Sequence, residues 1–224
     1  MQALMFIVAL MLLPVVSHAG TSSVVIAVAY NASAPSVRLQ VPADFVAMPI
    51  QIRNDSKDPA KRTDEIEKAL RSLTDKVHQQ PDLSMKQGVV SLSPREQSTL
   101  QGFSSYDSSG GSSAQLYVLG AMKQDATAFA VTKRLYQVIN AIPLGDGTKV
   151  ILGNTTLGLN DPEKYRDQIL GSIAKSITDT KKALGTSGAV EVDGLENQIC
   201  VMQLDERDVV LFINYRLRIQ TKPQ

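Results

Sequence analysis

Hydrophobic residues recur at helical spacing most clearly between residues 160 and 185. Tyr165, Ile169, Ile173 and Ile177 follow one another at four-residue steps, which places them on one face of a helix. Most of the residues between them are polar, as expected for the opposite face in contact with water. The pattern predicts an amphipathic helix whose isoleucines belong to the core.

The sequence also indicates where this helix begins and ends. Asn160 or Asp161 is a candidate N-cap, and Pro162 falls in the first turn, where a missing N–H costs little. Two lysines occupy the last turn, where the helix dipole favours cations. Gly185 can then adopt the left-handed conformation that ends many helices.

Two further helices are expected, over residues 58–78 and 126–142. Each has apolar residues on one side and polar residues on the other. The apolar stripes are Ile66, Leu70, Leu73 and Val77 in the first helix and Val131, Leu135, Val138, Ile139 and Ile142 in the second.

Short apolar or alternating runs predict strands over residues 23–29, 36–53, 85–93, 115–122, 149–159, 198–204 and 209–221. Pro42 and Pro49 favour edge positions or a bulge, because proline cannot donate to the ladder. Adjacent Val89 and Val90 break the alternation and predict burial on both faces. The Gly/Ser-rich segment 94–113 predicts an exposed loop at a hairpin tip.

This mixture of helices and strands predicts an α+β fold, with a largely antiparallel sheet and helices packed on one face. Residues 36–93 and 115–159 both have the order strand, helix, strand. The order suggests two strand–helix–strand lobes, although the residues themselves do not repeat.

The first nineteen residues, MQALMFIVALMLLPVVSHA, are typical of a secretory signal peptide with a small-x-small cleavage site. The alternative is an N-terminal membrane anchor, but the apolar run is shorter than the roughly 20 residues that a spanning helix needs. We therefore expect cleavage after residue 19 and export to the periplasm or the medium. Association with the outer membrane is the alternative location.

Charge and composition give no indication of a nucleic-acid partner. The formal net charge is +1 and tryptophan is absent, so neither an electrostatic footprint nor stacking residues indicate nucleic-acid binding. Cys200 is the only cysteine, which excludes an intramolecular disulfide. Its apolar neighbours predict a small buried strand residue and not a reactive thiol.

Few residues suggest chemistry. His78 is the only histidine after the expected cleavage site, and a lone histidine makes no zinc site without Cys or carboxylate partners. A Ser–His–Asp triad through His78 would have to assemble from distant positions, and no G-x-S-x-G elbow supports one. The carboxylates of Asp205, Glu206 and Asp208 lack EF-hand spacing and read as a solvated hairpin turn. Arg216, Arg218 and Gln220 alternate along one strand face, and an anion site or a subunit contact is compatible with them. We assign no catalytic, cofactor-binding or metal-binding residue and expect no cofactor.

Several segments in order resemble the SIMPL domain family of bacterial periplasmic and outer-membrane proteins linked to oxidative-stress defence. They are TDEIEKALRSLTDKV, KQGVVSLSP, GFSSYDSSGG, QLYVLGAM, FAVTKRLYQVINAIPLGDGTKVILGNTTLGLN, DPEKYRDQILGSIAKSITDTKKALG and VLFINYRLRI. The sixth is the most specific of them. The alanine-poor middle of this helix and the prolines in the first strands depart from the family pattern.

The resemblance implies one SIMPL-like domain over residues 20–224 and a non-enzymatic envelope protein that acts in stress defence by self-assembly or partner binding. It implies a homo-oligomer, since ring-shaped assemblies occur in the family, and it brings no catalytic residues. Two alternatives stay open: an exported hydrolase, and a surface adhesin or ligand-binding module that uses the loop around residues 101–113. The sequence does not decide whether the protein associates with a membrane.

Overall fold

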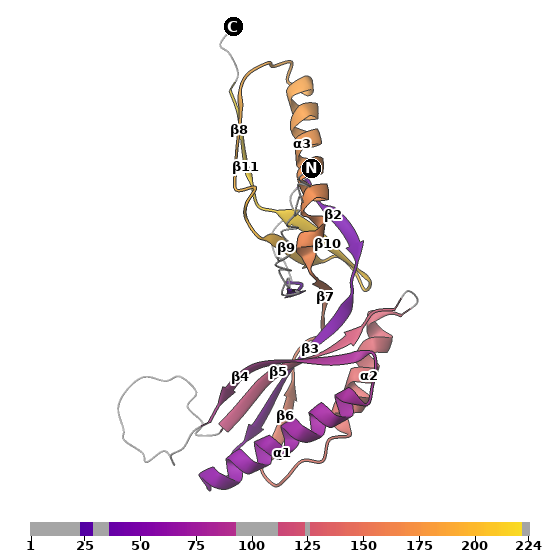
Figure 1. Ribbon diagram of the computed structural model, residues 1–224, viewed down its shortest axis with the longest axis vertical. Helices are drawn as coiled ribbons and strands as arrows, with labels where there is room; N and C mark the ends of the chain where they lie inside the picture. The colour runs from indigo at the N-terminus through magenta and orange to yellow at the C-terminus, as the bar shows by residue number, and fades with distance from the viewer. Residues whose placement is uncertain (1–22, 29–35, 93–111, 124–125, 221–224) are drawn as a thin grey trace, which may run out of the picture.

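The computed structural model describes residues 23–28, 36–92, 112–123 and 126–220. The molecule is elongated (Figure 1), with a twisted sheet and two helices at one end and a third helix beside a two-stranded ribbon at the other. The predicted α+β class is confirmed. The expected signal segment, residues 29–35 and most of the Gly/Ser-rich loop lie outside the described residues.

The elements have well-defined bounds. The helices are α1 Pro59–His78, α2 Ala128–Asn140, the 3-10 turn Pro162–Tyr165 and α3 Arg166–Ala183. The strands are β1 Val24–Ile26, β2 Leu39–Pro42, β3 Phe45–Asn54, β4 Leu83–Ser91, β5 Ser112–Ala121, β6 Thr148–Leu152, β7 Thr156–Asn160, β8 Val190–Asp193, β9 Ile199–Gln203, β10 Asp208–Ile213 and β11 Arg216–Ile219.

These strands form three sheets in which every pair of named strands is antiparallel. The main sheet has the order β1-β7-β3-β5-β4, and β6 pairs with β3 beyond the end of β7. A second sheet has the order β2-β10-β9, and β8 and β11 form a two-stranded ribbon. Both strand–helix–strand segments lie in the main sheet, because β3 of the first pairs with β5 and β6 of the second.

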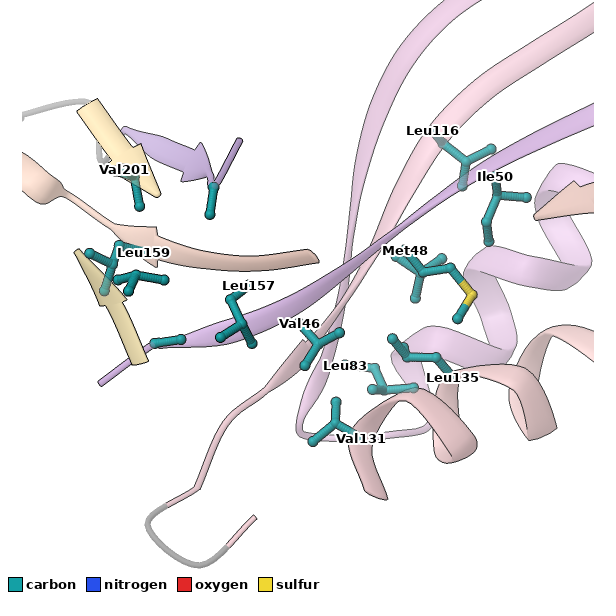
Figure 2. Close-up of a cluster of buried hydrophobic side chains, with 14 of the residues drawn as sticks. Val46, Met48, Ile50, Leu83, Leu116, Val131, Leu135, Leu157, Leu159 and Val201 are labelled. Carbon is teal, nitrogen blue, oxygen red and sulfur yellow. The ribbon is translucent and has the colours of Figure 1, made fainter. Parts of the chain in front are cut away.

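Helices α1 and α2 cover one face of the main sheet, as their apolar stripes require. Ile66, Leu73 and Val77 of α1 are buried, as are Leu135 and the other inward residues of α2. Strand β3 contributes alternate side chains to the same core, and Figure 2 shows Met48 and Ile50 on the side of the helices. We call this part, comprising β3, β4, β5 and β6 with α1 and α2, the helix-covered sheet.

The core continues from the helix-covered sheet into the second sheet through β7. Figure 2 shows Leu157 and Leu159 of β7 between Val46 of β3 and Val201 of β9. The buried Ile169 and Ile173 of α3 belong to the same cluster. The two ends of the molecule therefore share one hydrophobic core.

The prediction that Pro49 occupies an edge or a bulge is wrong, because β3 is a central strand. Residues 45–47 of β3 pair with β7 and residues 50–54 pair with β6, so Pro49 lies at the gap between them. The Pro49 carbonyl accepts from the Gly153 N–H at 2.8 Å on that side. The N–H and C=O of one strand residue point to the same side, so its missing donor costs no bond to β5. Pro42, by contrast, ends the edge strand β2, as predicted.

Val89 and Val90 are exposed, which contradicts the prediction of burial on both faces. The register of β4 against β5 shifts between Gln87 and Val90. This β-bulge sets two residues of β4 against one residue of β5 on an edge strand. The broken alternation in the sequence therefore marks a bulge and not a buried strand.

Two predicted long strands are each divided in two. The run 149–159 is interrupted around Gly153, so that β6 and β7 pair with different parts of β3. The run 209–221 is interrupted at Asn214 and Tyr215, where the chain leaves β10 for the ribbon. The second break is not visible in the periodicity, because the alternation of Ile213, Tyr215, Leu217 and Ile219 continues through it, whereas the polar residues Asn154 and Thr155 mark the first.

The start of the third helix also differs from the prediction. Asp161 has a left-handed backbone with φ of 50°, and neither it nor Asn160 caps the helix through its side chain. Pro162 opens a 3-10 turn, and the α-helix begins only at Arg166. The predicted end is confirmed, since Lys181 and Lys182 occupy the last turn and Gly185 has φ of 62°.

Candidate functional site

The most unusual part of the molecule is the end that we call the arm, which comprises α3 and the β8–β11 ribbon. In Figure 1 the ribbon and α3 extend away from the rest of the molecule. A two-stranded ribbon is only marginally stable by itself in water. The contacts at the base and along the faces of the ribbon therefore decide how it is held and which of its surfaces stay exposed.

Arg166 fastens the base of the arm. Its Nε and Nη2 donate to the two carboxylate oxygens of Glu163 at 2.6 and 3.1 Å. Its Nη1 and Nη2 also donate to the carbonyls of Leu195 and Asn197, both at 2.9 Å. One guanidinium thus ties the start of α3 to the turn between β8 and β9, and Asn197 in turn donates to the Asn214 carbonyl at 2.7 Å.

We call these contacts of Arg166 the clamp. Within it, the Arg166 guanidinium and the Glu163 carboxylate form a fixed ion pair. The hydrogen bond from Arg166 lowers the pKa of the Glu163 carboxyl below its ordinary value. The same bond raises the pKa of Arg166. Both groups therefore stay charged at neutral pH, and the arrangement holds the two segments together without offering a proton for chemistry.

The ribbon has one apolar and one charged face. Its register pairs Leu217 with Val192 and Ile219 with Val190, and these four residues are half-buried. The opposite face carries two acidic residues from β8 and two basic residues from β11, all exposed: Glu191, Asp193, Arg216 and Arg218. Arg218 and Glu191 form an ion pair at 3.5 Å.

The hydrophobic core stops at the base of the arm. Leu195 and Tyr215 pack against it, but none of the four apolar ribbon residues does so. On α3 the last buried residue is Ile173, and Ile177 one turn later is half-buried. Leu184, just after the helix, is 59% exposed. Apolar side chains of the arm are therefore only partly covered by the described part of the chain.

Backbone contacts hold the ribbon in shape at its far end. The Gln220 N–H donates to the Ala189 carbonyl at 3.0 Å. Gly188 lies so close to Gln220 that an added Cβ would come within 1.6 Å of its carbonyl oxygen. A side chain at residue 188 would therefore force the two segments apart.

Both edges of the ribbon present unpaired backbone groups, since β8 and β11 pair only with each other among the described strands. The bond between Gln220 and Ala189 fixes which residues exchange hydrogen bonds inside the ribbon. Because hydrogen-bonded and non-hydrogen-bonded pairs alternate, the backbone groups of Leu217 and Ile219 point outward from β11. Those of Val190 and Val192 point outward from β8 in the same way.

The residues singled out from the sequence lie on different elements and do not form one site: His78 ends α1, Cys200 lies on β9 and Asp205 lies in the turn after β9. His78 lies at the end of α1, as the predicted helix bounds imply, and its side chain is exposed. Asp205 accepts the N–H groups of Arg207 and Asp208 at 2.8 and 2.7 Å, which lower the pKa of its carboxyl. The predicted hairpin turn between β9 and β10 is therefore confirmed.

Cys200 is half-buried on β9 and not fully buried as predicted, because its side chain points to the face opposite Ile199 and Val201. Asn214 Nδ2 donates to its sulfur at 3.4 Å. Burial raises the pKa of the Cys200 thiol, which favours the protonated form at neutral pH.

Within the described residues, no group of three or more His, Cys, Asp or Glu side chains could hold a metal ion. In the same part of the chain, no helix has both the length and the apolarity needed to cross a membrane. The loop around residues 101–113, on which the hydrolase and adhesin alternatives depend, lies almost wholly outside it.

Comparisons with protein-family models, with curated proteins and with solved structures found no match for this chain. The resemblance to SIMPL proteins therefore depends on the sequence segments alone and stays a hypothesis.

Sequence reasoning did not find the most informative parts of the arm. Strand β8 was not predicted, although Val190 and Val192 alternate with acidic residues and Gly194 follows with φ of 86°. This alternation is the signal that could have revealed it. The role of Arg166 has no such signal, because its carbonyl partners lie about 30 residues away in the sequence.

Proposed function

We propose that this protein is an exported, non-enzymatic assembly unit that associates with further copies of itself through the arm. The observation that carries the proposal is the charge of the two free ribbon edges. Strand β8 presents only acidic exposed side chains and β11 only basic ones. One edge of the ribbon is therefore complementary to the other edge of a second copy.

Pairing β11 of one copy with β8 of the next in an antiparallel ladder would repeat the register found inside the ribbon. Leu217 would lie opposite Val192 of the next copy, where the outward backbone groups of both residues are available for hydrogen bonds. Arg216 and Arg218 would then face Asp193 and Glu191 of that copy. Opposite charges across a strand pair are favourable, and the apolar faces would join into one stripe.

The symmetric alternatives are less favourable. Pairing two β11 edges would set arginines against arginines, and pairing two β8 edges would set carboxylates against carboxylates. The favoured contact is thus head-to-tail, and such contacts produce rings when the rotation closes and filaments when it does not.

Size-exclusion chromatography with light scattering tests the assembly on the mature chain. We expect an oligomer that dissociates on dilution or in high salt, because salt screens exposed charges. A strictly monomeric protein at every concentration would contradict the proposal.

Two charge-reversal variants test the edge pairing. The first, Arg216→Glu with Arg218→Glu, makes both edges acidic, and the second, Glu191→Arg with Asp193→Arg, makes both edges basic. We expect each variant alone to be monomeric, and an equimolar mixture to assemble as alternating copies. Each variant also sets like charges opposite each other inside its own ribbon, so assembly of the mixture is the result that identifies the edges as the interface. Undisturbed assembly of either variant alone would show that the ribbon edges are not the interface.

Export and the link to stress defence belong to the same proposal and are supported by residues 1–19 and by the SIMPL resemblance. Mass spectrometry of the protein recovered from a periplasmic fraction or from the medium should show loss of these 19 residues. A cytoplasmic, full-length product would contradict export. Peroxide sensitivity of a strain without the protein, rescued by the wild-type chain and not by the two charge-reversal variants, would connect assembly to defence.

A further inference from the structure

The face of the helix-covered sheet that α1 and α2 leave open contains a groove of about 400 Å³. This volume lies within the range of small-molecule sites, which run from about 300 to 1,000 Å³. The groove crosses β3, β4, β5 and β6, and its side chains come from the positions that alternate with the core residues. It lies away from the arm and is independent of the proposed assembly.

The walls of the groove are mainly apolar. Pro49 and Tyr117 face each other across β3 and β5, and Ile151 of β6 and Val89 of β4 flank them. Tyr117, Ile151 and Val89 are 37%, 47% and 69% exposed. Four apolar side chains gathered on an uncovered sheet face are unlike the scattered single exposures that are normal on a protein surface.

Two glycines shape the groove. An added Cβ at Gly88, in the bulge of β4, would come within 2.8 Å of the Gln115 carbonyl oxygen. An added Cβ at Gly153, between β6 and β7, would come within 2.6 Å of Pro49 Cγ. The backbone therefore approaches the floor of the groove at both sides, where any side chain would collide with it.

The charge around the groove is positive. Lys86 of β4 lies directly opposite Tyr117 in the register and shares its face of the sheet. Among the described residues Lys86 takes part in no ion pair, whereas Arg53 and Lys149 on the same face both contact Asp55. In the part of the chain that the structure describes, no acidic residue lines the groove itself. The exposed ammonium beside an apolar groove is complementary to an anionic group attached to an aliphatic body.

We propose that this groove binds a monoanionic aliphatic amphiphile of the fatty-acid class. The hydrocarbon chain lies against Pro49, Tyr117 and Ile151, where it covers apolar surface that the described residues leave in water. The carboxylate pairs with Lys86 at the β4 side. The two glutamines of the floor, Gln51 and Gln115, supply no charge and do not oppose an anion.

Isothermal titration calorimetry of the full mature protein with sodium dodecanoate, kept below its micelle concentration, tests the site. We expect saturable binding at one site per chain. Dodecyltrimethylammonium, with the same chain length and the opposite charge, should bind at least about tenfold more weakly. Equal affinity for the two probes, or no saturable binding of dodecanoate, would overturn the proposal.

Two variants locate the site. Ile151→Glu places a carboxylate in the groove and should abolish dodecanoate binding, and Lys86→Gln should weaken it about tenfold while leaving binding of neutral dodecyl maltoside unchanged. Matched controls are Phe129→Glu and Lys133→Gln on the exposed side of α2, where a hydrophobic and a charged residue change away from the groove. These controls should bind as the wild type does.

Light scattering on the same variants separates a ligand site from a protein contact. If Ile151→Glu lowers the oligomer mass and dodecanoate does not bind the wild type, the open face is covered by a second copy and the ligand proposal is wrong. If the control variants weaken dodecanoate as much as the groove variants, the binding is unspecific, which also overturns it.

Discussion

The helix-covered sheet and the arm are built from the same kinds of elements but differ in how completely they cover their apolar residues. In the helix-covered sheet, two amphipathic helices bury their stripes on a four-stranded surface, and Leu73, Leu135 and Ile52 have no exposed surface. In the arm, one helix lies beside two four-residue strands, and Val192, Leu217 and Ile219 stay half-buried. On its helix side the first region is therefore closed by its own elements, whereas in the second the described residues leave apolar side chains and strand edges only partly covered.

The largest effect on stability is expected for Leu135→Ala, which leaves a cavity between α2 and the sheet. We expect the free energy of unfolding to fall by about 2–5 kcal/mol, measured by urea denaturation under monomeric conditions. The matched arm variant Leu217→Ala should cost less than about 1 kcal/mol in the monomer, because the side chain is only half removed from water. Equal losses for the two variants would mean that the arm is as well packed as the sheet.

Gly188→Ala should destabilise the β8–β11 ribbon of the arm without affecting the helix-covered sheet. A methyl group at this position would come within 1.6 Å of the Gln220 carbonyl oxygen, so the backbone must shift. We expect a local loss of about 1–3 kcal/mol, seen as faster hydrogen exchange in β8 and β11 with unchanged exchange in β3 and β5. The control is Gly171→Ala on α3, where nothing lies within 4 Å of an added Cβ, and which should stabilise the helix by up to about 1 kcal/mol. Unchanged exchange in Gly188→Ala would contradict the close contact.

Arg166→Lys tests the clamp at the base of the arm. Lysine cannot keep the two-oxygen contact with Glu163 together with the bonds to the Leu195 and Asn197 carbonyls. We expect a loss of about 1–2 kcal/mol in the unfolding free energy. Arg71→Lys is the control, since the Arg71 pair with Glu67 is exposed on α1 and should cost less than about 0.5 kcal/mol. If Arg166→Lys lowers the unfolding free energy no more than Arg71→Lys does, the contacts of Arg166 do not stabilise the arm.

The smallest expected effect concerns pH. The pKa of Glu163 is lower in the folded chain than its ordinary value of 4.5, so the folded state favours the carboxylate. Its contribution to stability is therefore present above pH 4.5 and is lost as the pH falls through the lowered pKa. Glu163→Gln should be less stable than the wild type by under about 1 kcal/mol at pH 7, since the pair is partly exposed. This difference should shrink toward pH 3 in urea titrations, and a difference that stays constant with pH would show that the charge is not the cause.

The helices were the most predictable elements, and the reason is local. The stripes led by Ile66 in α1 and by Val131 in α2 repeat at 3.6-residue spacing, and one stretch of chain contains all the information needed. The Asp58 side chain caps α1 by accepting the Ala60 N–H at 2.9 Å, which follows the usual preference for aspartate at this place. No position far away in the sequence has to be known for either feature.

Features that depend on a partner strand were not predictable. Pro49 is tolerated in a central strand only because β6 and β7 divide beside it, and this division involves residues about 100 positions away. Val89 reads as a buried strand residue until the register against β5 shows the bulge. The candidate interface has the same character, since the opposite charges of Arg218 and Glu191 become an edge pattern only once β8 and β11 pair.

By itself the sequence determined the α+β class and the three amphipathic helices, because periodicity and residue spacing are local properties. Only the tertiary structure decided that one run of alternating residues leaves β10 to form a separate ribbon with β8. It also decided which apolar residues stay uncovered, on the arm and on the open face of the sheet. Burial depends on what packs against a residue, and in this chain that is set by strand pairings between segments far apart in the sequence.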